Sequence, residues 1–397
     1  MKNKPLSAIF LIVFINLLGF GLILPLLPYY AETFGASDTT IGLLVASYAA
    51  AQLIGAPILG RLSDRYGRRP ILLLSIFGTL VSLLMLGFAK TLLVLFLARI
   101  TDGLTGGNIS VAQAYITDVT DEKSRAKGLG MIGAAFGLGF ILGPASGGFL
   151  SQYGYAVPAF AAAGLVMINL LMVAFWLPES LSLEKRTTQN LIQPRITFSA
   201  LLAALQRPYS GSLLIIRFFF GLAFAIFQTI FSLYVLRRFN LDAQQTGFIL
   251  TYVGVLSVIV QGFLVGKLNE RFPDPILILS STILMGLSLL AWSFAPSVPV
   301  LLIILAPIAL SGGILNTILS SALTKTVQAQ EIGGILGLSS SIESLTRVIA
   351  PTLGGVLLDQ FGTGSPGIFS AIILAGLCVY IWKTIFDQRN FQFASLK

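Results

Sequence analysis

Histidine is absent from the sequence, and Cys378 is the single cysteine. One cysteine cannot form an intrachain disulfide, and without histidine or a cysteine cluster the usual zinc ligand sets are missing. The sequence also has no GxxxxGK[ST] phosphate-binding loop and no GxSxG nucleophile elbow. These absences argue against a metalloenzyme, a nucleotide-driven machine and a hydrolase. We therefore expect no enzyme activity, no metal and no other cofactor.

Charged residues are scarce as well. Only 10% of the 397 residues are charged, whereas 55% are hydrophobic and the mean hydropathy is +0.89. So few charges cannot cover the surface of a soluble globule. We expect a lipid bilayer to surround most of the chain.

The hydrophobic residues fall into twelve stretches of about 20 residues, the length that a helix needs to cross about 30 Å of hydrocarbon. Barrel strands are a poor alternative, because they are about half as long and alternate apolar with polar residues. We predict an all-α membrane protein with twelve transmembrane helices. They are placed at residues 6–30, 39–60, 70–89, 91–117, 127–150, 156–177, 209–236, 244–266, 275–295, 298–324, 332–357 and 366–386.

The basic residues predict the orientation of these helices, because cytoplasmic loops are enriched in Lys and Arg. Nineteen basic residues fall on the side that holds both termini, and three fall on the other side, namely Lys90, Arg237 and Arg238. Both termini are therefore expected in the cytoplasm, with the first segment kept as an uncleaved helix. This distribution accounts for the formal net charge of +9, so no nucleic-acid partner is expected.

Two parts of the sequence resemble each other, which indicates an internal duplication. The charged turn Gly60–Pro70 has a counterpart in Gly266–Phe272, 206 residues later. We predict an N-terminal six-helix half at 1–178, a cytoplasmic linker at 179–208 and a C-terminal six-helix half at 209–397. Parallel repeats of this kind are typical of transporters that bind substrate near the midplane between the halves. Further matches at a constant offset of 207 pair Pro144, Gly147 and Gly148 with Pro351, Gly354 and Gly355.

Several motifs, in the right order, resemble those of the major facilitator superfamily over the whole chain. Residues 60–69 resemble the signature between its helices 2 and 3. The fourth-helix motif is resembled by Leu95, Arg99 and Gly103, with Asp102 where a glutamine is common. The fifth helix resembles the GxxxGPxxGG motif of the exporting antiporters at Gly139, Gly143, Pro144, Gly147 and Gly148.

Within that superfamily the chain resembles the twelve-helix drug:proton antiporters, and tetracycline exporters in particular. Residues 47–75 and 98–148 carry the likeness to tetracycline exporters. Those exporters have acids in the first and third helices, where this chain has Asn16 and Ser82. The resemblance implies proton-driven drug export. The two departures argue against tetracycline as the solute and place the proton-carrying acid elsewhere. The first-helix pattern is matched by Leu18, Gly19, Pro25 and Pro28.

The charged turn after residue 60 is expected to form part of a cytoplasmic gate. Asp64 is expected at the N-terminus of helix 11, near Gly333, where the helix dipole favours an acid by about 0.3–1 kcal/mol. Arg65 is then expected to pair with Asp118 and hold one state closed. The alternative is that these cations only set the topology. The residues assigned to the gate are Gly60, Asp64, Arg65, Gly67, Arg68 and Asp118.

Five ionisable side chains lie inside predicted spans, where each costs at least about 2.5–3.5 kcal/mol unless it is paired or hydrated. Arg99 and Asp102 are three residues apart and Glu343 and Arg347 are four apart, so each pair shares a helix face. These are either neutralised structural ion pairs or proton-coupling sites in which Asp102 or Glu343 carries the proton. The fifth side chain is Arg217.

Polar and aromatic residues within the spans are expected to line a substrate cavity. A cavity with many aromatic rings and few amides suits a lipophilic, planar or cationic solute better than a sugar. The same phenylalanines are also compatible with lipid contact. The cavity residues are Asn16, Gln52, Gln113, Phe136, Arg217, Phe224, Gln228, Phe231 and Asn316.

Together these features predict a proton-coupled antiporter that exports lipophilic small molecules or drugs by alternating access. The glycines of the fifth helix would either pack two helices closely or also seal and flex the route between the halves. A sugar exporter or a lipid or lysolipid facilitator is the alternative on the same fold. A membrane-embedded enzyme or a transport-dead receptor is the alternative from another class. We expect a monomer in a bacterial inner membrane, with protons, lipid and a lipophilic solute as its partners.

Overall fold

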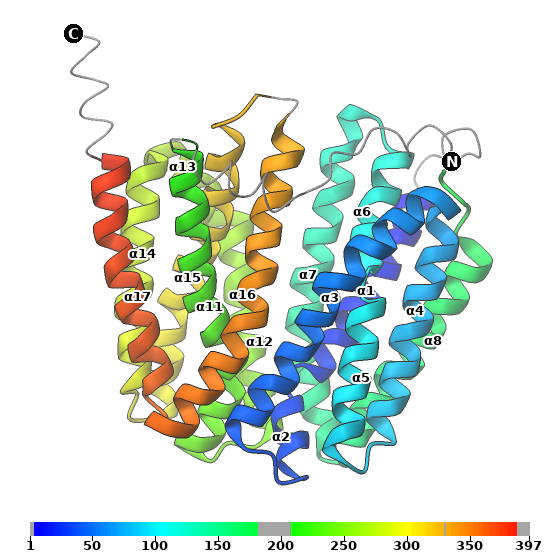
Figure 1. Cartoon of the computed structure of the whole chain (residues 1–397), viewed down its shortest axis with the longest axis horizontal. Coiled ribbons are helices and arrows are strands. Elements are labelled where there is room, and N and C mark those ends of the chain that lie inside the picture. Colours follow the sequence, from blue (N-terminus) through cyan, green and yellow to red (C-terminus); the bar gives the residue numbers. More distant parts are fainter. Residues whose placement is uncertain (1–3, 182–206, 208, 329–330, 387–397) are drawn as a thin grey trace. The chain divides into compact units, whose positions relative to one another are not determined.

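The computed structural model describes residues 4–181, 207, 209–328 and 331–386. All regular secondary structure in these residues is helical (Figure 1), which confirms the predicted all-α architecture. The predicted linker at 179–208 lies outside the described residues, apart from 179–181 and 207.

The chain divides into two compact units. Unit 1 comprises Met1–Pro194 together with Asn240–Gly254, and unit 2 comprises Arg195–Phe239 together with Val255–Lys397. Helix α12 (Ala243–Ile259) is therefore shared, because its first part up to Gly254 belongs to unit 1 and the remainder to unit 2.

Unit 1 contains the helices α1 to α8, and two of its predicted spans are interrupted. The first span is divided after Ile23, where Leu24–Leu26 separate two helices and Pro25 supplies no backbone N–H. The fourth span is divided at Gly106 and Gly107. The helices are α1 (Lys4–Ile23), α2 (Leu27–Glu32), α3 (Asp38–Tyr66), α4 (Arg68–Gly87), α5 (Leu92–Thr105), α6 (Asn108–Val119), α7 (Glu122–Ser151) and α8 (Ala156–Trp176).

Unit 2 has long helices with two π-helical segments, the first of which continues α12. Such segments contain i→i+5 hydrogen bonds and are frequent at functional positions. The elements are α11 (Ser210–Phe239), η2 (Val260–Leu264), α13 (Val265–Arg271), α14 (Asp274–Ser293), α15 (Val298–Thr324), α16 (Ile332–Phe361), α17 (Ser365–Ile381) and η4 (Trp382–Phe386).

The two units repeat the same helix pairings. In unit 1, α1 packs on α7 and α8, and α4 packs on α5 and α8. In unit 2, α11 packs on α16 and α17, and α14 packs on α15 and α17. The equivalent helices thus have equivalent neighbours, as an internal duplication predicts.

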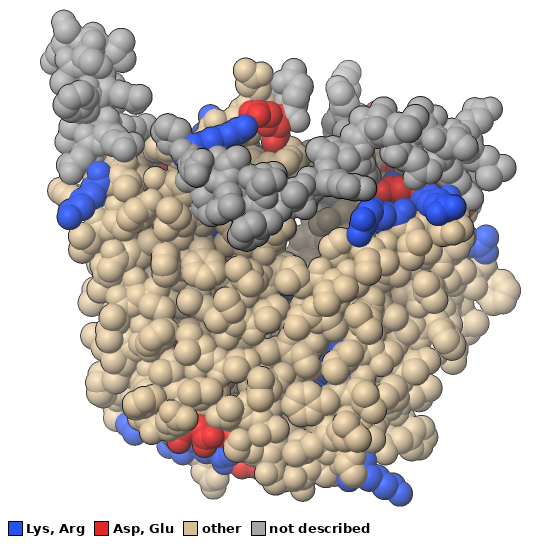
Figure 2. Space-filling model, viewed as in Figure 1, with Lys and Arg blue, Asp and Glu red and all other residues tan. Residues whose placement is uncertain are grey.

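Ten helices of the described residues are long and apolar enough to cross a membrane. The apolar part of α1, Ile9–Ile23, is shorter. Helix α16 has 30 residues but is not among the ten, and it carries Glu343, Arg347 and several serines. In the view of Figure 2, uncharged residues cover most of the sides of the helices, and most of the charged side chains that are visible lie near the helix ends.

Short polar side chains begin several of these helices. Ser37 accepts a hydrogen bond from the Thr40 N–H at 3.2 Å at the start of α3. Asp121 accepts one from the Ser124 N–H at 2.9 Å at the start of α7. These caps satisfy N–H groups that have no partner within the helix.

Candidate functional site

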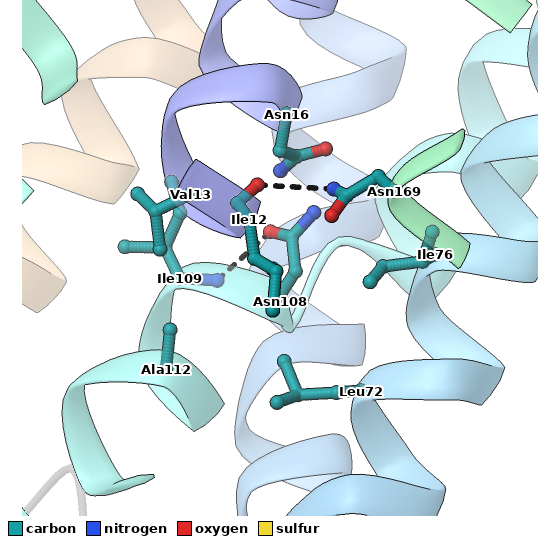
Figure 3. Close-up of a pocket in the computed structure, with 9 residues that line it drawn as sticks. All are labelled: Ile12, Val13, Asn16, Leu72, Ile76, Asn108, Ile109, Ala112 and Asn169. Carbon is teal, nitrogen blue, oxygen red and sulfur yellow. Dashed lines mark hydrogen bonds between the residues drawn. The ribbon is translucent and has the colours of Figure 1, made fainter. Parts of the chain in front are cut away.

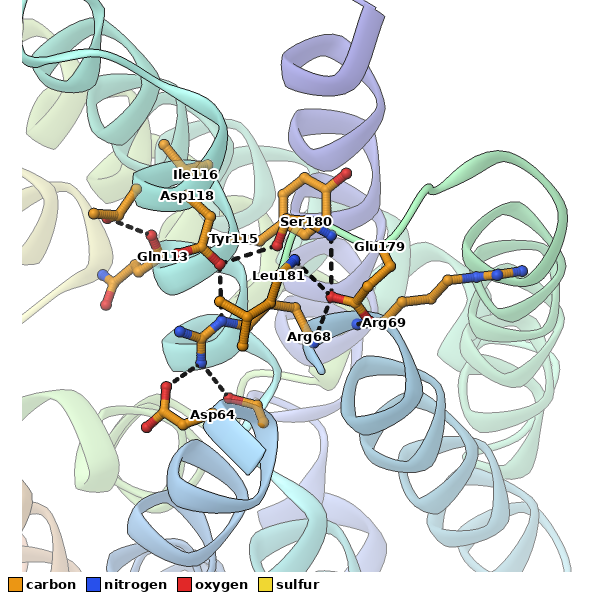
Figure 4. A network of polar contacts seen from close by, with 12 residues as sticks. Asp64, Arg68, Arg69, Gln113, Tyr115, Ile116, Asp118, Glu179, Ser180 and Leu181 are labelled. Carbon is orange, nitrogen blue, oxygen red and sulfur yellow. Dashed lines mark hydrogen bonds and ion pairs between the residues drawn. The ribbon is translucent and has the colours of Figure 1, made fainter. Parts of the chain in front are cut away.

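The charged turn between α3 and α4 forms a buried network around Arg68 (Figure 4). Gly67 between the helices has φ +106°, a conformation that side chains with a Cβ rarely adopt. The chain then folds Arg68 back, so that its Nη1 lies 2.5 Å from Asp64 Oδ1 and its Nε lies 3.0 Å from Asp118 Oδ2. Arg68 is only 4% exposed. The two carboxylates, both in unit 1, compensate its buried charge.

This network corrects one predicted contact. Asp118 pairs with Arg68, whereas we predicted Arg65 as its partner. Arg65 lies in the last turn of α3, is exposed, and places its guanidinium over the Tyr66 ring with the centroid at 5.4 Å. The reversal at Gly67 brings Arg68 rather than Arg65 toward α6. Gly60 lies within α3, because this helix continues to Tyr66.

The sequence analysis missed Glu179, which lies just after α8. Its carboxylate accepts hydrogen bonds from the backbone N–H groups of Arg68 at 2.9 Å and Arg69 at 3.2 Å, at the start of α4. The next residue, Ser180, donates to Asp118 Oδ2 at 3.0 Å. The start of the predicted linker is thus tied into the network (Figure 4). A contact across 111 residues leaves no local sequence signal.

The glycine motif of α7 makes two close helix contacts within unit 1. A Cβ on Gly143 would lie 2.7 Å from backbone atoms of Gly21 in α1, and a Cβ on Gly147 would clash with the Leu22 carbonyl oxygen. Gly139 of α7 likewise faces Leu17 of α1. Only glycine allows the two backbones to approach this closely.

The remaining residues of the motif face the first part of α12. A Cβ on Gly148 would lie 2.9 Å from Ala243 O, and a Cβ on Gly247 would clash with the Pro144 carbonyl oxygen. Tyr29 in α2 strengthens this packing, because its hydroxyl lies 2.5 Å from Thr246 Oγ1. The motif therefore packs α7 between α1 and the first part of α12.

Arg99 and Asp102 in α5 form one of the two predicted ion pairs. Arg99 Nη1 lies 3.3 Å from Asp102 Oδ2, and the residues are 2% and 8% exposed. The Arg99 guanidinium lies over the Tyr48 ring, 4.2 Å from its centroid, and Thr79 hydrogen-bonds to Asp102. Arg99 Nε and Nη2 are buried and have no hydrogen-bond partner among the described residues. Gln52 links Tyr48 to the helix break, donating to the Tyr48 hydroxyl at 2.9 Å and to Gly106 O at 3.1 Å.

The second predicted pair belongs to a larger cluster in unit 2. Glu343 Oε1 accepts a hydrogen bond from Arg347 at 2.7 Å, and its Oε2 accepts one from Arg217 at 2.8 Å. Arg217 in α11 also donates to Asn316 Oδ1 in α15 at 2.9 Å. The cluster thus joins three helices and contains two guanidinium groups and one carboxylate.

Asn16 lines a pocket in unit 1 with two further asparagines, Asn108 and Asn169 (Figure 3). Asn169 donates to Ile12 O at 3.0 Å, and its Oδ1 is buried without a hydrogen-bond partner among the described residues. Asn108 Oδ1 accepts from the Ile109 N–H at 2.8 Å. The sequence analysis missed Asn108 and Asn169, which α6 and α8 bring beside α1. The other lining residues are Ile12, Val13, Leu72, Ile76, Ile109 and Ala112.

The other predicted cavity residues differ in their surroundings. Gln113 and Gln228 are exposed, and Phe136 is half-buried. Phe231 is 1% exposed and meets the Phe227 ring edge-on, whereas Phe224 is half-buried and stacks on Phe220. The described residues contain no group of three or more His, Cys, Asp or Glu side chains that could hold a metal ion.

Residues 9–210 and 213–392 match the family model of the Major Facilitator Superfamily. This chain belongs to the major facilitator superfamily. The motif resemblance is therefore confirmed, and the chain is a multi-pass membrane protein of a transporter family.

Facilitator relatives match over nearly the whole chain. Multidrug resistance protein 2 of Bacillus subtilis is 30% identical over 95% of this chain and 94% of its own length. The class B tetracycline resistance protein of Escherichia coli is 32% identical over 96% and 94%. The class H tetracycline resistance protein of Pasteurella multocida is 34% identical over 98% and 97%.

Solved structures share the facilitator fold. The crystal structure of the nucleoside transporter NupG superimposes with a TM-score of 0.80 at 14% identity, covering 96% of this chain and 99% of that one. The crystal structure of the human organic anion transporter MFSD10 gives a TM-score of 0.72 at 22% identity, with the same coverage. At these identities the likeness concerns the fold alone.

Proposed function

We propose that this chain is a proton-coupled antiporter that exports lipophilic small molecules by alternating access. The full-length relatives named for multidrug and tetracycline resistance support drug-like solutes. The observation that carries proton coupling is the Arg99–Asp102 pair, a single acid and a single cation buried in α5. Members of this transporter family move solutes without covalent chemistry, so we propose that the chain has no enzyme activity.

Asp102 is the acid that we propose to carry the proton. It faces one arginine at 3.3 Å, whereas Glu343 lies between two arginines at 2.7 and 2.8 Å. A proton on Asp102 removes the attraction that holds Arg99, whose guanidinium keeps its contact with the Tyr48 ring. The buried Arg99 N–H groups without partners favour a second arrangement of this side chain, since unpaired buried donors are costly.

Alternating access requires contacts that form in one state and break in the other. We propose that the Asp64–Arg68–Asp118 network lies at the cytoplasmic end of the bundle and forms part of a gate there. The contact of α7 with the first part of α12 would close the opposite end. We also propose that the chain crosses the membrane twelve times with both termini in the cytoplasm. Its halves are joined by a linker at 179–208, and the transporter is a monomer.

Reconstituted transport tests the proton coupling. Purified protein in proteoliposomes is exposed to a pH gradient, and accumulation of a panel of cationic, neutral and anionic lipophilic dyes is followed by fluorescence. We expect the gradient to drive at least one dye, and Asp102→Asn to abolish this accumulation while dye binding persists. Asp359→Asn, an exposed acid near the end of α16, is the control and is expected to transport normally.

Two outcomes would contradict the proposal. Dye uptake that only equilibrates across the membrane and does not depend on the pH gradient would indicate facilitated diffusion, as in a sugar or lipid facilitator. Gradient-driven accumulation that survives in Asp102→Asn would remove Asp102 from the proton path. Release of protons into the external buffer on dye addition, followed with a pH indicator, separates antiport from a membrane-potential effect.

A further inference from the structure

The cluster in unit 2 has an unbalanced charge. Arg217 and Arg347 each donate to a different oxygen of Glu343, so a single carboxylate serves two guanidinium groups. Asn316 is neutral and accepts from Arg217. The four side chains together carry a formal charge of +1. By contrast, the Arg99–Asp102 pair of unit 1 has no net charge.

The surplus charge lies at Arg347, in the middle of a long helix. Arg347 follows the start of the 30-residue α16 at Ile332 by 15 residues, which is about 22 Å along the helix axis. Its side chain is too short to reach either end, and its exposed fraction is 59%. Thr346, the preceding residue, packs against Gly221 of α11, whereas most of the Arg347 side chain stays exposed. A charge at this depth must face water or a ligand rather than hydrocarbon.

Arg347 also keeps most of its hydrogen-bonding capacity. A guanidinium has five N–H donors and stays protonated in proteins. Arg347 uses one of them, for Glu343, and makes no other hydrogen bond with the described residues. The remaining donors form a planar fork that matches the two oxygens of a carboxylate or sulfonate. Glu343 already accepts one hydrogen bond on each oxygen, and one of these comes from Arg217.

We propose that the exported solute carries an anionic group, and that Arg347 binds this group while Arg217 and Glu343 hold Arg347 in place. Phe224, two turns after Arg217 on α11, is half-buried and offers an aromatic surface on the same unit. The preferred solute is therefore an aromatic acid with a lipophilic body. This inference rests on the proposed function, because it names the solute class of the same exporter.

Binding of matched probes tests the solute class. Detergent-purified full-length protein is titrated with naphthoate, naphthamide and naphthylmethylammonium, which share a ring system and differ in charge. Affinity is measured by calorimetry and by the rise in melting temperature, since a ligand that binds the folded protein stabilises it. We expect naphthoate to bind about tenfold or more tightly than either analogue.

Variants of Arg347 locate the site. Arg347→Gln is expected to weaken naphthoate binding about tenfold or more and leave naphthamide binding unchanged. Arg347→Lys, which keeps the charge but lacks the fork, is expected to restore part of the affinity. Arg207→Gln is the control, because Arg207 is an exposed arginine of the same unit that pairs with the single carboxylate of Glu331 at 3.1 Å.

The outcomes separate this inference from the proposed function. Equal affinity for naphthoate and naphthamide would overturn the inference, and so would no naphthoate binding up to about 1 mM. Unchanged naphthoate binding in both Arg347 variants would also overturn it. If a pH gradient still drives a cationic dye in these cases, proton-coupled export stands. If naphthoate binds through Arg347 but no gradient drives any solute, the anion site stands and proton coupling falls.

Discussion

Replacing Gly143 with alanine is expected to destabilise unit 1, because the new methyl group would meet backbone rather than a side chain. The added Cβ would lie 2.7 Å from Gly21 Cα and C and 3.1 Å from Leu22 N. Optimal carbon–carbon separations are about 3.5–4.0 Å, so α1 must move about 1 Å from α7. No rotamer change can relieve a clash with backbone, and overpacking of this kind costs about 1–3 kcal/mol.

A matched substitution in the same helix separates this clash from the general effect of replacing glycine. A Cβ on Gly133 would meet nothing within 4 Å. Gly133→Ala removes only the flexibility of glycine, which favours alanine in a helix interior by about 0.5–1 kcal/mol. Thermal unfolding of the two purified variants should therefore give shifts of opposite sign. Equal shifts, or a Gly143→Ala protein as stable as the parent, would refute the reasoning.

A double substitution sharpens the test, because Gly21 and Gly143 face each other. A Cβ on Gly21 would lie 2.8 Å from Gly139 O and 3.2 Å from Gly143 Cα. Once the first methyl group has separated the helices, the second has less to displace. Gly21→Ala with Gly143→Ala should therefore destabilise by less than the sum of the single changes, whereas independent sites would add.

Three further changes probe contacts within unit 1. Glu179→Ala removes the carboxylate that caps the start of α4, so a loss of about 0.5–2 kcal/mol is expected in thermal unfolding, and an unchanged melting temperature would exclude the cap. Tyr29→Phe removes the hydroxyl that bonds to α12, and backbone amides of residues 243–254 should then exchange hydrogen faster, while the exposed Tyr153→Phe should leave them unchanged. Asp118→Asn leaves the buried Arg68 with Asp64 as its one described carboxylate partner, which should cost about 1–3 kcal/mol by the same melting assay, and a neutral result would show that Asp64 suffices.

Local sequence patterns predicted the helices and the ion pairs within them. Arg99 with Asp102 and Glu343 with Arg347 have spacings of three and four, which place both members on one helix face wherever the helix packs. The same physics explains the helical fold, since hydropathy over about 20 residues is a local quantity. The breaks at Leu24–Leu26 and at Gly106 and Gly107 were not predicted, because hydropathy is blind to lost backbone hydrogen bonds.

Contacts between distant helices were the part that the sequence could not provide. Arg217 reaches Glu343 across 126 residues and Asn316 across 99, and Glu179 reaches Arg68 across 111. No periodicity links such positions, so they follow only from how the helices pack. The prediction that Arg65 pairs with Asp118 was wrong for a similar reason, because the direction of the chain after Gly67 decides which arginine faces α6.

A comparison of the two repeats shows which charges within the helices are not required for helix packing. The helix pairings of unit 1 recur in unit 2, yet the charges do not recur. At the offset of 207 set by Pro144 and Pro351, Glu343 and Arg347 of α16 correspond to Phe136 and Phe140 of α7, which stack on each other. The counterpart of α5 and α6 is α15, which carries no charged residue. Since each repeat packs its helices without the other's charges, helix packing does not require these charged side chains, which is consistent with the transport roles proposed for them.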